Sequence, residues 1–465
     1  MLIRSTLTIV ALFAATPALS QALTAEEHTQ VDRIVTETLA ATDVPSASIA
    51  VVRGGEIVFA RAYGKQAEHM PVAREEAPYQ IASVSKQFTA AAILLLAEDG
   101  KLSLDDKVAR YIPDITDGDK ISIRQLLSHT SGLQDYWPQD YSFKAMATPV
   151  TPQGIVDRWA KKPLDFTPGT QWQYSNTGYV VAGMIVEKVA GIPLLDFLKL
   201  RVFAPLGITA YDQDLAVGKG FPQGYGRAAM GPLRVATPAA RGWLFAAGEL
   251  AMSARDLAKW DVARLNRKIL NPEDWMLQET PVKLADGTST GYGLGVSIGA
   301  ANGRRYIEHT GEAVGFLSYN IVFPDERAAI VVLTNSWSSD AFVTIGQGLA
   351  RTLLPAPPPA DLADSPALAR ARLVFGQLRT GTLDRSLLTE NANYYFTPVT
   401  LTDFRTSLAP LGDPVTFAQT GTARLRGGFI GRSFRVTYGT RVLAISTYAD
   451  RSGKIEQFLV APAKR

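Results

Sequence analysis

The first regular pattern along this chain is an apolar stripe that recurs with helical spacing. The stripe consists of Val31, Ile34, Val35 and Leu39. It predicts an amphipathic helix over 24–41. Two β-rich runs follow over 47–52 and 57–63, and the pair Gly54-Gly55 between them is a strong hairpin signal. We therefore expect a helix beside an antiparallel pair of strands.

Sheet-forming patterns return late in the chain. Three strand-like runs lie over 304–310, 315–323 and 328–333. A helical pattern over 341–354 follows them. Helical patterns and loops dominate the long segment between the two sheet-forming regions, roughly 76–250. Strands at both ends with a helical insert between them predict one composite α/β domain over 24–354, not two independent halves.

A proline-rich stretch separates this domain from the rest of the chain. The sequence Pro-Ala-Pro-Pro-Pro at 355–359 predicts a stiff, extended linker over 355–362. Beyond it, 363–465 combines one or two helical patterns with four strand-like runs. These runs lie over 415–418, 434–438, 441–448 and 455–460. They predict a separate small α+β domain without a motif that indicates chemistry. Its role as a lid, a partner-binding module or a stability cap is open, and its partner is unknown.

The first twenty residues differ from everything that follows. Arg4 precedes an apolar run over 7–15, and Pro17 with Ala18-Leu19-Ser20 forms a small-residue cleavage pattern. The run is too short to cross a bilayer. We expect 1–20 to be a secretory signal peptide, which implies a periplasmic or secreted bacterial protein with no stable membrane insertion after its removal.

Composition narrows the classes of function. Hydrophobic residues at 46% and charged residues at 20% are typical of a soluble globular protein. The formal net charge is only +3 and the basic residues are scattered, which argues against nucleic acid or an anionic membrane as partners. The chain has no cysteine, which excludes a cysteine nucleophile and thiolate metal sites. We expect no cofactor or metal, and a small-molecule or peptide substrate as partner.

The main chemical signal lies at the start of an unusually apolar helical stretch. Helix formers run from Ala90 to Ala97, and Gly100 marks the end. Ser83 and Lys86 are three apart and would share a helix face, placing a hydroxyl beside an amine whose pKa burial lowers. This spacing occurs once in the chain and fits a serine nucleophile with a lysine base. The alternative is a helix cap at Ser83 and a lysine that extends to water.

A second dense stretch supplies candidate partners. Tyr174 and Asn176 precede a helix predicted over 180–189, and on an extended segment their side chains point the same way. An ordinary amphipathic tyrosine and a helix-capping asparagine are the alternatives. His129, in the hydroxyl-rich loop 128–133, is a weak candidate for the partner of a serine, because no carboxylate lies at an orienting position.

One nucleophile motif is rejected. Gly287-Thr288-Ser289-Thr290-Gly291 fits G-x-S-x-G, but that elbow requires a buried strand before the serine and a helix after it. A glycine-rich segment surrounds it instead. We expect a hairpin loop here and no nucleophile at Ser289.

Together the motifs resemble those of the beta-lactamase-related serine hydrolases, the group of class C beta-lactamases, D,D-peptidases, D-aminopeptidases and related esterases. Three motifs occur in that family's order and approximate spacing within roughly 24–354: Ser83 with Lys86, Tyr174 with Asn176, and His309-Thr310-Gly311. The resemblance implies a beta-lactamase/transpeptidase-like α/β fold. Its antiparallel sheet is flanked by helices, and a helical domain faces it across the active-site cleft.

The resemblance also implies roles for individual residues. Ser83 would attack a carbonyl to form an acyl-enzyme. Lys86 and Tyr174 would share the general-base role, with Tyr174 as a phenolate or proton relay whose pKa the lysine lowers. Asn176 would hold the substrate's amide or carbonyl, and the backbone N–H groups of Ser83 and Glu312 would form the oxyanion hole.

The third motif departs from the penicillin-recognising pattern, which has a lysine where His309 stands. An imidazole with an ordinary pKa near ~6.5 is mostly neutral at pH 7 and offers no permanent cation to a carboxylate. Glu312 would repel carboxylate substrates and suit an amine. With Thr310 and Gly311 as further substrate-binding residues, we expect an exported serine hydrolase acting on an ester or a small amide of the D-amino-acid type. A penicillin-binding D,D-peptidase or beta-lactamase is one alternative, and a non-catalytic binding or sensor module is another.

Overall fold

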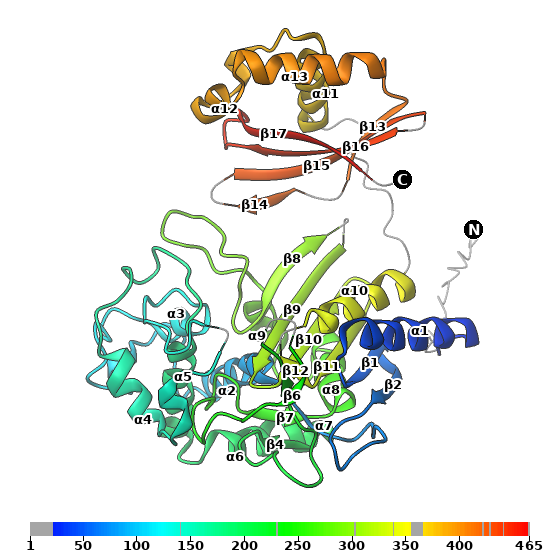
Figure 1. The fold of residues 1–465 in the computed structure, drawn as a ribbon. Helices are drawn as coiled ribbons and strands as arrows, with labels where there is room; N and C mark the ends of the chain where they lie inside the picture. Colours follow the sequence, from blue (N-terminus) through cyan, green and yellow to red (C-terminus); the bar gives the residue numbers. More distant parts are fainter. Residues whose placement is uncertain are drawn as a thin grey trace, which may run out of the picture.

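The computed structural model describes residues 22–463, apart from 140, 229–230, 302–303, 338, 355–365, 421–422, 427–428 and 440. The predicted signal peptide, 1–20, and the predicted linker, 355–362, lie outside the described residues. Figure 1 shows a large domain and a small C-terminal one. The small domain begins at α11 (Pro366–Thr380).

The large domain combines long α-helices with short ones. Its helices are α1 (Ala25–Thr42), α2 (Lys86–Glu98), α3 (Ile123–Leu127), α4 (Pro152–Ile155), α5 (Asn176–Ala190), α6 (Leu194–Leu198), α7 (Ala204–Leu206), α8 (Ala254–Leu265), α9 (Pro272–Gln278) and α10 (Ala341–Leu353). Its strands are β1 (Ser46–Arg53), β2 (Glu56–Gly64), β3 (Tyr79–Gln80), β4 (Ala210–Asp212), β5 (Tyr225–Gly226), β6 (Arg234–Val235), β7 (Leu250–Met252), β8 (Ser297–Ala301), β9 (Arg304–Ala313), β10 (Phe316–Phe323), β11 (Ala328–Thr334) and β12 (Ser336–Trp337).

The main sheet joins the two ends of the domain, as the sequence predicts. Its strand order is β2-β1-β11-β10-β9-β8, and every neighbouring pair is antiparallel. The predicted hairpin links β1 to β2, and Gly54 and Gly55 have φ of 63° and 83°, the left-handed values that a two-residue hairpin turn requires. Strand β8 was not predicted, because its five residues, with a central Gly299, lack a β-rich pattern.

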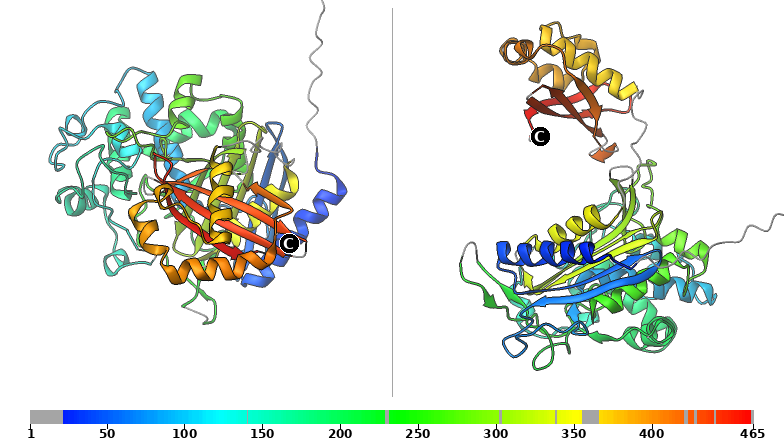
Figure 2. Two further views of the ribbon diagram at one scale, coloured as in Figure 1. Left: turned by 90° about the horizontal axis from the view of Figure 1, so that it is seen from above. Right: turned by 90° about the vertical axis from the view of Figure 1, so that its right-hand side faces the viewer.

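Alternate residues of the sheet serve two separate cores. Ile49 and Val51 of β1 pack with α1 and α10 on one face, whereas Ala50 and Val52 belong to the larger core that contains α2 and α8. Figure 2 shows α1 and α10 side by side over one face of this sheet. The sheet is therefore a central layer, and the period-two alternation of its strands matches burial on both sides.

The C-terminal domain is a small α+β unit, as expected, but its described residues form three α-helices where one or two helices were predicted. They are α11, α12 (Glu390–Tyr395) and α13 (Pro398–Leu408). The strands are β13 (Thr416–Gln419), β14 (Arg424–Arg426), β15 (Phe429–Tyr438), β16 (Arg441–Ala449) and β17 (Ile455–Pro462), in the order β13-β15-β16-β17 with β14 beside β15. The short helix α12, capped by Thr389, carries too few apolar positions to show a period.

None of the helices that the structure describes combines the length and apolarity needed to cross a membrane.

Candidate active site

Ser83 lies on a tight 3-10 turn, Ala82–Ser85, immediately before α2. Ala82 is buried with φ of 49°, a left-handed conformation that costs free energy for any residue with a Cβ. Ser83 itself is half-buried and faces a cavity. The residue that precedes α2 is Ser85, whose Oγ accepts from the Leu250 N–H at 3.1 Å. The alternative reading of Ser83 as a helix cap is therefore wrong.

Lys86 is fully buried beneath Ser83 and does not extend to water. Its Nζ lies 2.9 Å from Ser83 Oγ, 2.8 Å from Asn176 Oδ1 and 2.7 Å from the Ala247 carbonyl oxygen. The side-chain amide oxygen of Asn176 and the backbone carbonyl oxygen of Ala247 can only accept hydrogen bonds. A neutral amine that donates one proton to each of them must direct its lone pair at the Ser83 hydroxyl, which is the geometry of a general base.

Burial also sets the protonation of this amine. Loss of hydration in the interior lowers the pKa of Lys86 to about 7, and the charge of Asp135 opposes the shift. A substantial fraction of Lys86 is therefore neutral at physiological pH, as a base for a serine hydroxyl requires.

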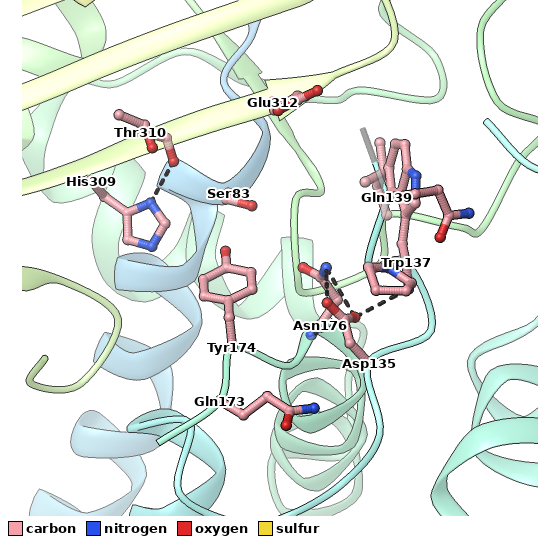
Figure 3. Close-up of a pocket in the computed structure, with 12 residues that line it drawn as sticks. Ser83, Asp135, Trp137, Gln139, Gln173, Tyr174, Asn176, His309, Thr310 and Glu312 are labelled. Carbon is pink, nitrogen blue, oxygen red and sulfur yellow. Dashed lines mark hydrogen bonds between the residues drawn. The ribbon is translucent and has the colours of Figure 1, made fainter. Parts of the chain in front are cut away.

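Tyr174 completes the group around the nucleophile. Its hydroxyl points toward Ser83 in Figure 3, and Lys86 Nζ lies 4.9 Å from its ring centre. Burial, with a smaller contribution from Asp135, raises the pKa of Tyr174 well above 10. The expectation that the lysine lowers this pKa is wrong for this structure, because desolvation of the phenolate dominates. Tyr174 is a protonated phenol that can donate.

Asn176 is committed to the protein rather than exposed as a free substrate ligand. Its Oδ1 accepts from Lys86, and its Nδ2 donates to Asp135 Oδ1 at 3.2 Å. The cap of α5 is Ser175, whose Oγ accepts from the Gly178 N–H, so the reading of Asn176 as the cap is wrong. Asn176 still lines the cavity, but its amide primarily orients the lysine.

Asp135 is a site residue that sequence reasoning missed. Its Oδ1 accepts from the backbone N–H groups of Asn176 and Trp137, both at 3.1 Å. Burial raises its pKa, and these backbone hydrogen bonds oppose the rise. No motif contains Asp135; the nearest signal was its position just after the loop 128–133.

His129 positions Tyr174 from both sides. Its ring lies 4.2 Å from the Tyr174 ring, its Nδ1 accepts from the Ser175 N–H at 3.1 Å, and its carbonyl oxygen accepts from the Gln173 N–H at 2.9 Å. Because Nδ1 accepts, the proton of the neutral ring is on Nε2. Burial, together with the charge of Lys86, lowers the pKa of His129 well below 6.5. His129 does not reach Ser83 as a base; it fixes the segment that carries the tyrosine.

His309 is a neutral imidazole, as its difference from lysine suggested. Its Nδ1 donates to the Thr310 carbonyl oxygen, so its Nε2 must accept from the Tyr292 hydroxyl at 2.8 Å. Burial lowers the pKa of His309 to about 3, and the charge of Lys86 contributes. Both ring nitrogens are in use, and the residue presents no cation to a substrate.

Gly311 acts through packing and does not line the cavity. A Cβ added at this position would lie 2.1 Å from the Ile81 carbonyl oxygen and 2.2 Å from Ser318 Oγ. The absent side chain lets β9 approach the segment that leads into the Ser83 turn. Gly311 therefore sets the distance between the strand and the nucleophile.

The cavity in front of Ser83 has a volume of about 530 Å³, and we call it the Ser83 cavity. Its lining includes Ser83, Asp135, Trp137, Gln139, Gln173, Tyr174, Asn176, Leu244, His309, Thr310 and Glu312. Figure 3 shows the labelled side chains gathered from β9, the turn before α2, the segment that leads into α5, and the loop that carries Asp135, Trp137 and Gln139. Glu312 accepts from the Trp337 indole N–H. The structure thus brings Ser83, Tyr174, Asn176, His309, Thr310 and Glu312 around one space, with Lys86 below it.

The G-x-S-x-G motif at Ser289 lies away from the Ser83 cavity. Ser289 lies on a hairpin closed by the Leu284 N–H to the Thr288 carbonyl and is not part of the cavity, as predicted. Within the described part of the chain, no group of three or more His, Cys, Asp or Glu side chains is placed to hold a metal ion.

Comparisons with known proteins agree with this geometry. The family model described as Beta-lactamase matches residues 31–351. Penicillin-binding protein 4* of Bacillus subtilis (strain 168) is 28% identical over 317 residues, which cover 64% of this chain and 70% of that protein. The D-amino acid amidase of Ochrobactrum anthropi SV3, solved with L-phenylalanine amide, is 26% identical with a TM-score of 0.59, over 71% of this chain and 98% of that one.

A third comparison extends to the small domain. The octameric penicillin-binding protein homologue of Pyrococcus abyssi aligns with 94% of this chain and 96% of its own, with a TM-score of 0.63 and 22% identity. At this identity the likeness concerns the fold alone.

Proposed function

Because the chain belongs to the Beta-lactamase family of serine hydrolases, we propose that it cleaves a small amide or ester whose acyl group carries a free amine, through an acyl-enzyme on Ser83. The observation that carries this proposal is the buried Lys86 amine, whose lone pair can face the Ser83 hydroxyl. A binding module has no need of such a base, and this argues against a non-catalytic sensor.

The proposed reaction has two halves. Ser83 Oγ attacks the substrate carbonyl carbon as its proton passes to Lys86, and the tetrahedral oxyanion forms between the backbone N–H groups of Ser83 and Glu312. The bond to the leaving group then breaks, and the leaving nitrogen or oxygen takes a proton from the Tyr174 hydroxyl, which Lys86 resupplies. Water repeats the sequence on the ester carbonyl and releases the acid and Ser83.

The lining of the Ser83 cavity supports an amine-bearing acyl group. The carboxyl groups of Asp135 and Glu312 face this space, whereas His309 is neutral and hydrogen-bonded at both nitrogens. An ammonium on the substrate meets opposite charge there, and a carboxylate meets like charge. The amidase from Ochrobactrum anthropi, named for D-amino acids, is consistent with this direction.

A substrate panel tests the proposal. We expect a D-amino acid amide with a free amine to have a kcat/KM up to about fivefold above that of its N-acetylated form, since one ion pair near a protein surface is worth up to about 1 kcal/mol. Glu312→Gln should reduce this preference, and Glu76→Gln, the same change at an exposed position, should not. Equal rates on both forms in the wild type would overturn the preference for amines.

A penicillin-binding peptidase or beta-lactamase is the competing function, favoured by the names of several relatives. It predicts hydrolysis of a chromogenic cephalosporin, and His309→Lys should then raise that activity. Export to the periplasm or beyond is proposed from the sequence of 1–20 alone, and N-terminal sequencing of the mature protein from the producing cell tests it.

A further inference from the structure

A second cavity lies behind the loop 241–249, which lies against the Ser83 cavity. The loop carries Ala247, whose carbonyl accepts from Lys86, and Leu244, which lines both cavities. The second cavity has a volume of about 480 Å³, and Ser83, Lys86 and Tyr174 are not among its lining residues. We call it the Gln213 cavity.

One side of the Gln213 cavity is apolar. Its apolar lining consists of Pro149, Val150, Pro152, Leu244 and Phe245. Such a wall suits a short hydrocarbon stem and gains free energy with the apolar area that it covers, at about 25 cal/mol per Å².

Two other lining residues, Gln213 and Glu249, each have a buried side-chain oxygen without a partner. Gln213 is only 4% exposed, and its Nε2 donates to Asp214 Oδ1 at 3.0 Å, which leaves Oε1 as the free end of the amide. Among the described residues, neither Gln213 Oε1 nor Glu249 Oε2 has a hydrogen-bond partner, and both atoms are buried. A buried acceptor left unpaired costs roughly 1–3 kcal/mol, so a ligand that donates to both would recover that free energy.

The charge of the lining selects the kind of donor. Three carboxyl groups, those of Asp212, Asp214 and Glu249, face one cation, Arg241, which is exposed. Burial, with the charges of Asp212, Glu187 and Asp214, raises the pKa of Glu249 to about 8, so this carboxyl is largely protonated at neutral pH; an incoming cation would oppose the rise and favour the ionised acceptor. Asp214 is already occupied, because its Oδ2 accepts from the Gly242 N–H at 2.7 Å.

We propose that the Gln213 cavity is a second ligand site that binds a small primary amine, with its ammonium at Gln213 Oε1 and Glu249 and its alkyl stem against the apolar wall. A metal ion does not fit this place, because no three acidic or imidazole side chains of the described residues converge on one point. The site is separate from the proposed reaction and does not depend on it.

Calorimetric titration of the full-length Ser83→Ala chain with n-butylamine tests this site. For a ligand of this size we expect a dissociation constant on the order of millimolar. The uncharged isostere n-butanol should bind at least about tenfold more weakly, because it lacks the ammonium. Glu249→Gln and Gln213→Leu should each weaken butylamine binding by at least about tenfold, the cost of one lost charged or buried hydrogen bond.

The Ser83 cavity is also acidic and attracts amines in the proposed function, so Glu312→Gln is the matched comparison: the component of butylamine binding that Glu249→Gln removes should persist in it. Loss of binding in Glu312→Gln but not in Glu249→Gln would place the amine in the Ser83 cavity and overturn the proposal. No heat at the highest concentration that leaves the protein folded would overturn it too. If both cavity variants fail to fold, wild-type protein with Ser83 blocked by a phosphonate decides: retained butylamine binding supports the second site, and lost binding contradicts it.

Discussion

The Lys86 amine lies 2.9 Å from the Ser83 hydroxyl oxygen, and its two other partners, Asn176 Oδ1 and the Ala247 carbonyl, can only accept. With a pKa lowered to about 7 by burial, this amine loses its proton near neutral pH. Since a base must be unprotonated, kcat/KM should rise with pH through a midpoint near 7 and fall about tenfold for each unit below pH 6. Initial rates on an aryl ester between pH 5 and 9 measure this. A flat profile would contradict the role of Lys86, and Lys86→Arg, which stays protonated, should be inactive throughout.

Tyr174→Phe removes the hydroxyl that points toward Ser83. Because the raised pKa keeps this phenol protonated, we expect its main role to be donation of a proton to the leaving group. An amide nitrogen needs that proton and a p-nitrophenolate does not. The kcat of the variant on an amide should therefore fall by a factor of about 10²–10⁴. On a p-nitrophenyl ester, the factor by which kcat falls should be smaller by about tenfold or more. Tyr394→Phe, at an exposed position of α12, is the control. Equal losses on both substrates would argue against the donor role.

His129→Asn removes the ring that packs on Tyr174 while tolerating the left-handed φ of 60° at this position. We expect kcat to fall by about 10- to 100-fold through misplacement of the tyrosine, with little change in KM. The midpoint of the pH profile should not move, because a pKa well below 6.5 leaves His129 neutral around the midpoint near 7. His69→Asn, an exposed histidine, should behave as wild type. A shifted midpoint would instead indicate that His129 takes part in proton transfer.

Gly311→Ala places a Cβ against the Ile81 carbonyl and Ser318 Oγ. Overpacking of this kind costs about 1–3 kcal/mol, so the free energy of unfolding should fall by that amount in urea titrations. The turn that carries Ser83 should shift as β9 moves away, and kcat should fall as well. Gly376→Ala, in α11 with open space around it, should be neutral or slightly stabilising. An unchanged Gly311→Ala enzyme would mean that β9 and the turn are not in close contact.

Much of the fold could be predicted from local sequence patterns. The hairpin at Gly54-Gly55 and the late strands each have a period and a turn signal within a few residues, so their elements follow from local chemistry. The start of α5 at Asn176 was missed by four residues, because Ser175 was not recognised as its cap.

The site residues likewise fall into those that the sequence reveals and those that only the fold brings together. Ser83 with Lys86 and Tyr174 with Asn176 have fixed short spacings that the sequence displays. Asp135 lies 41 residues from Asn176 along the chain and meets it only through folding, so no spacing reveals it. The raised pKa of Tyr174 arises from three-dimensional burial, which the sequence does not express.

An acyl-enzyme on Ser83 is tested most directly by mass spectrometry of the peptides of the acylated protein. Wild type and Ser83→Ala are mixed with an activated p-nitrophenyl ester, quenched in acid within the first turnovers and digested for peptide mapping. The account predicts one added acyl group on the wild-type peptide that contains Ser83, multiple turnovers of p-nitrophenol release, and neither in Ser83→Ala. An acyl group on a different residue, or full turnover by Ser83→Ala, would contradict it.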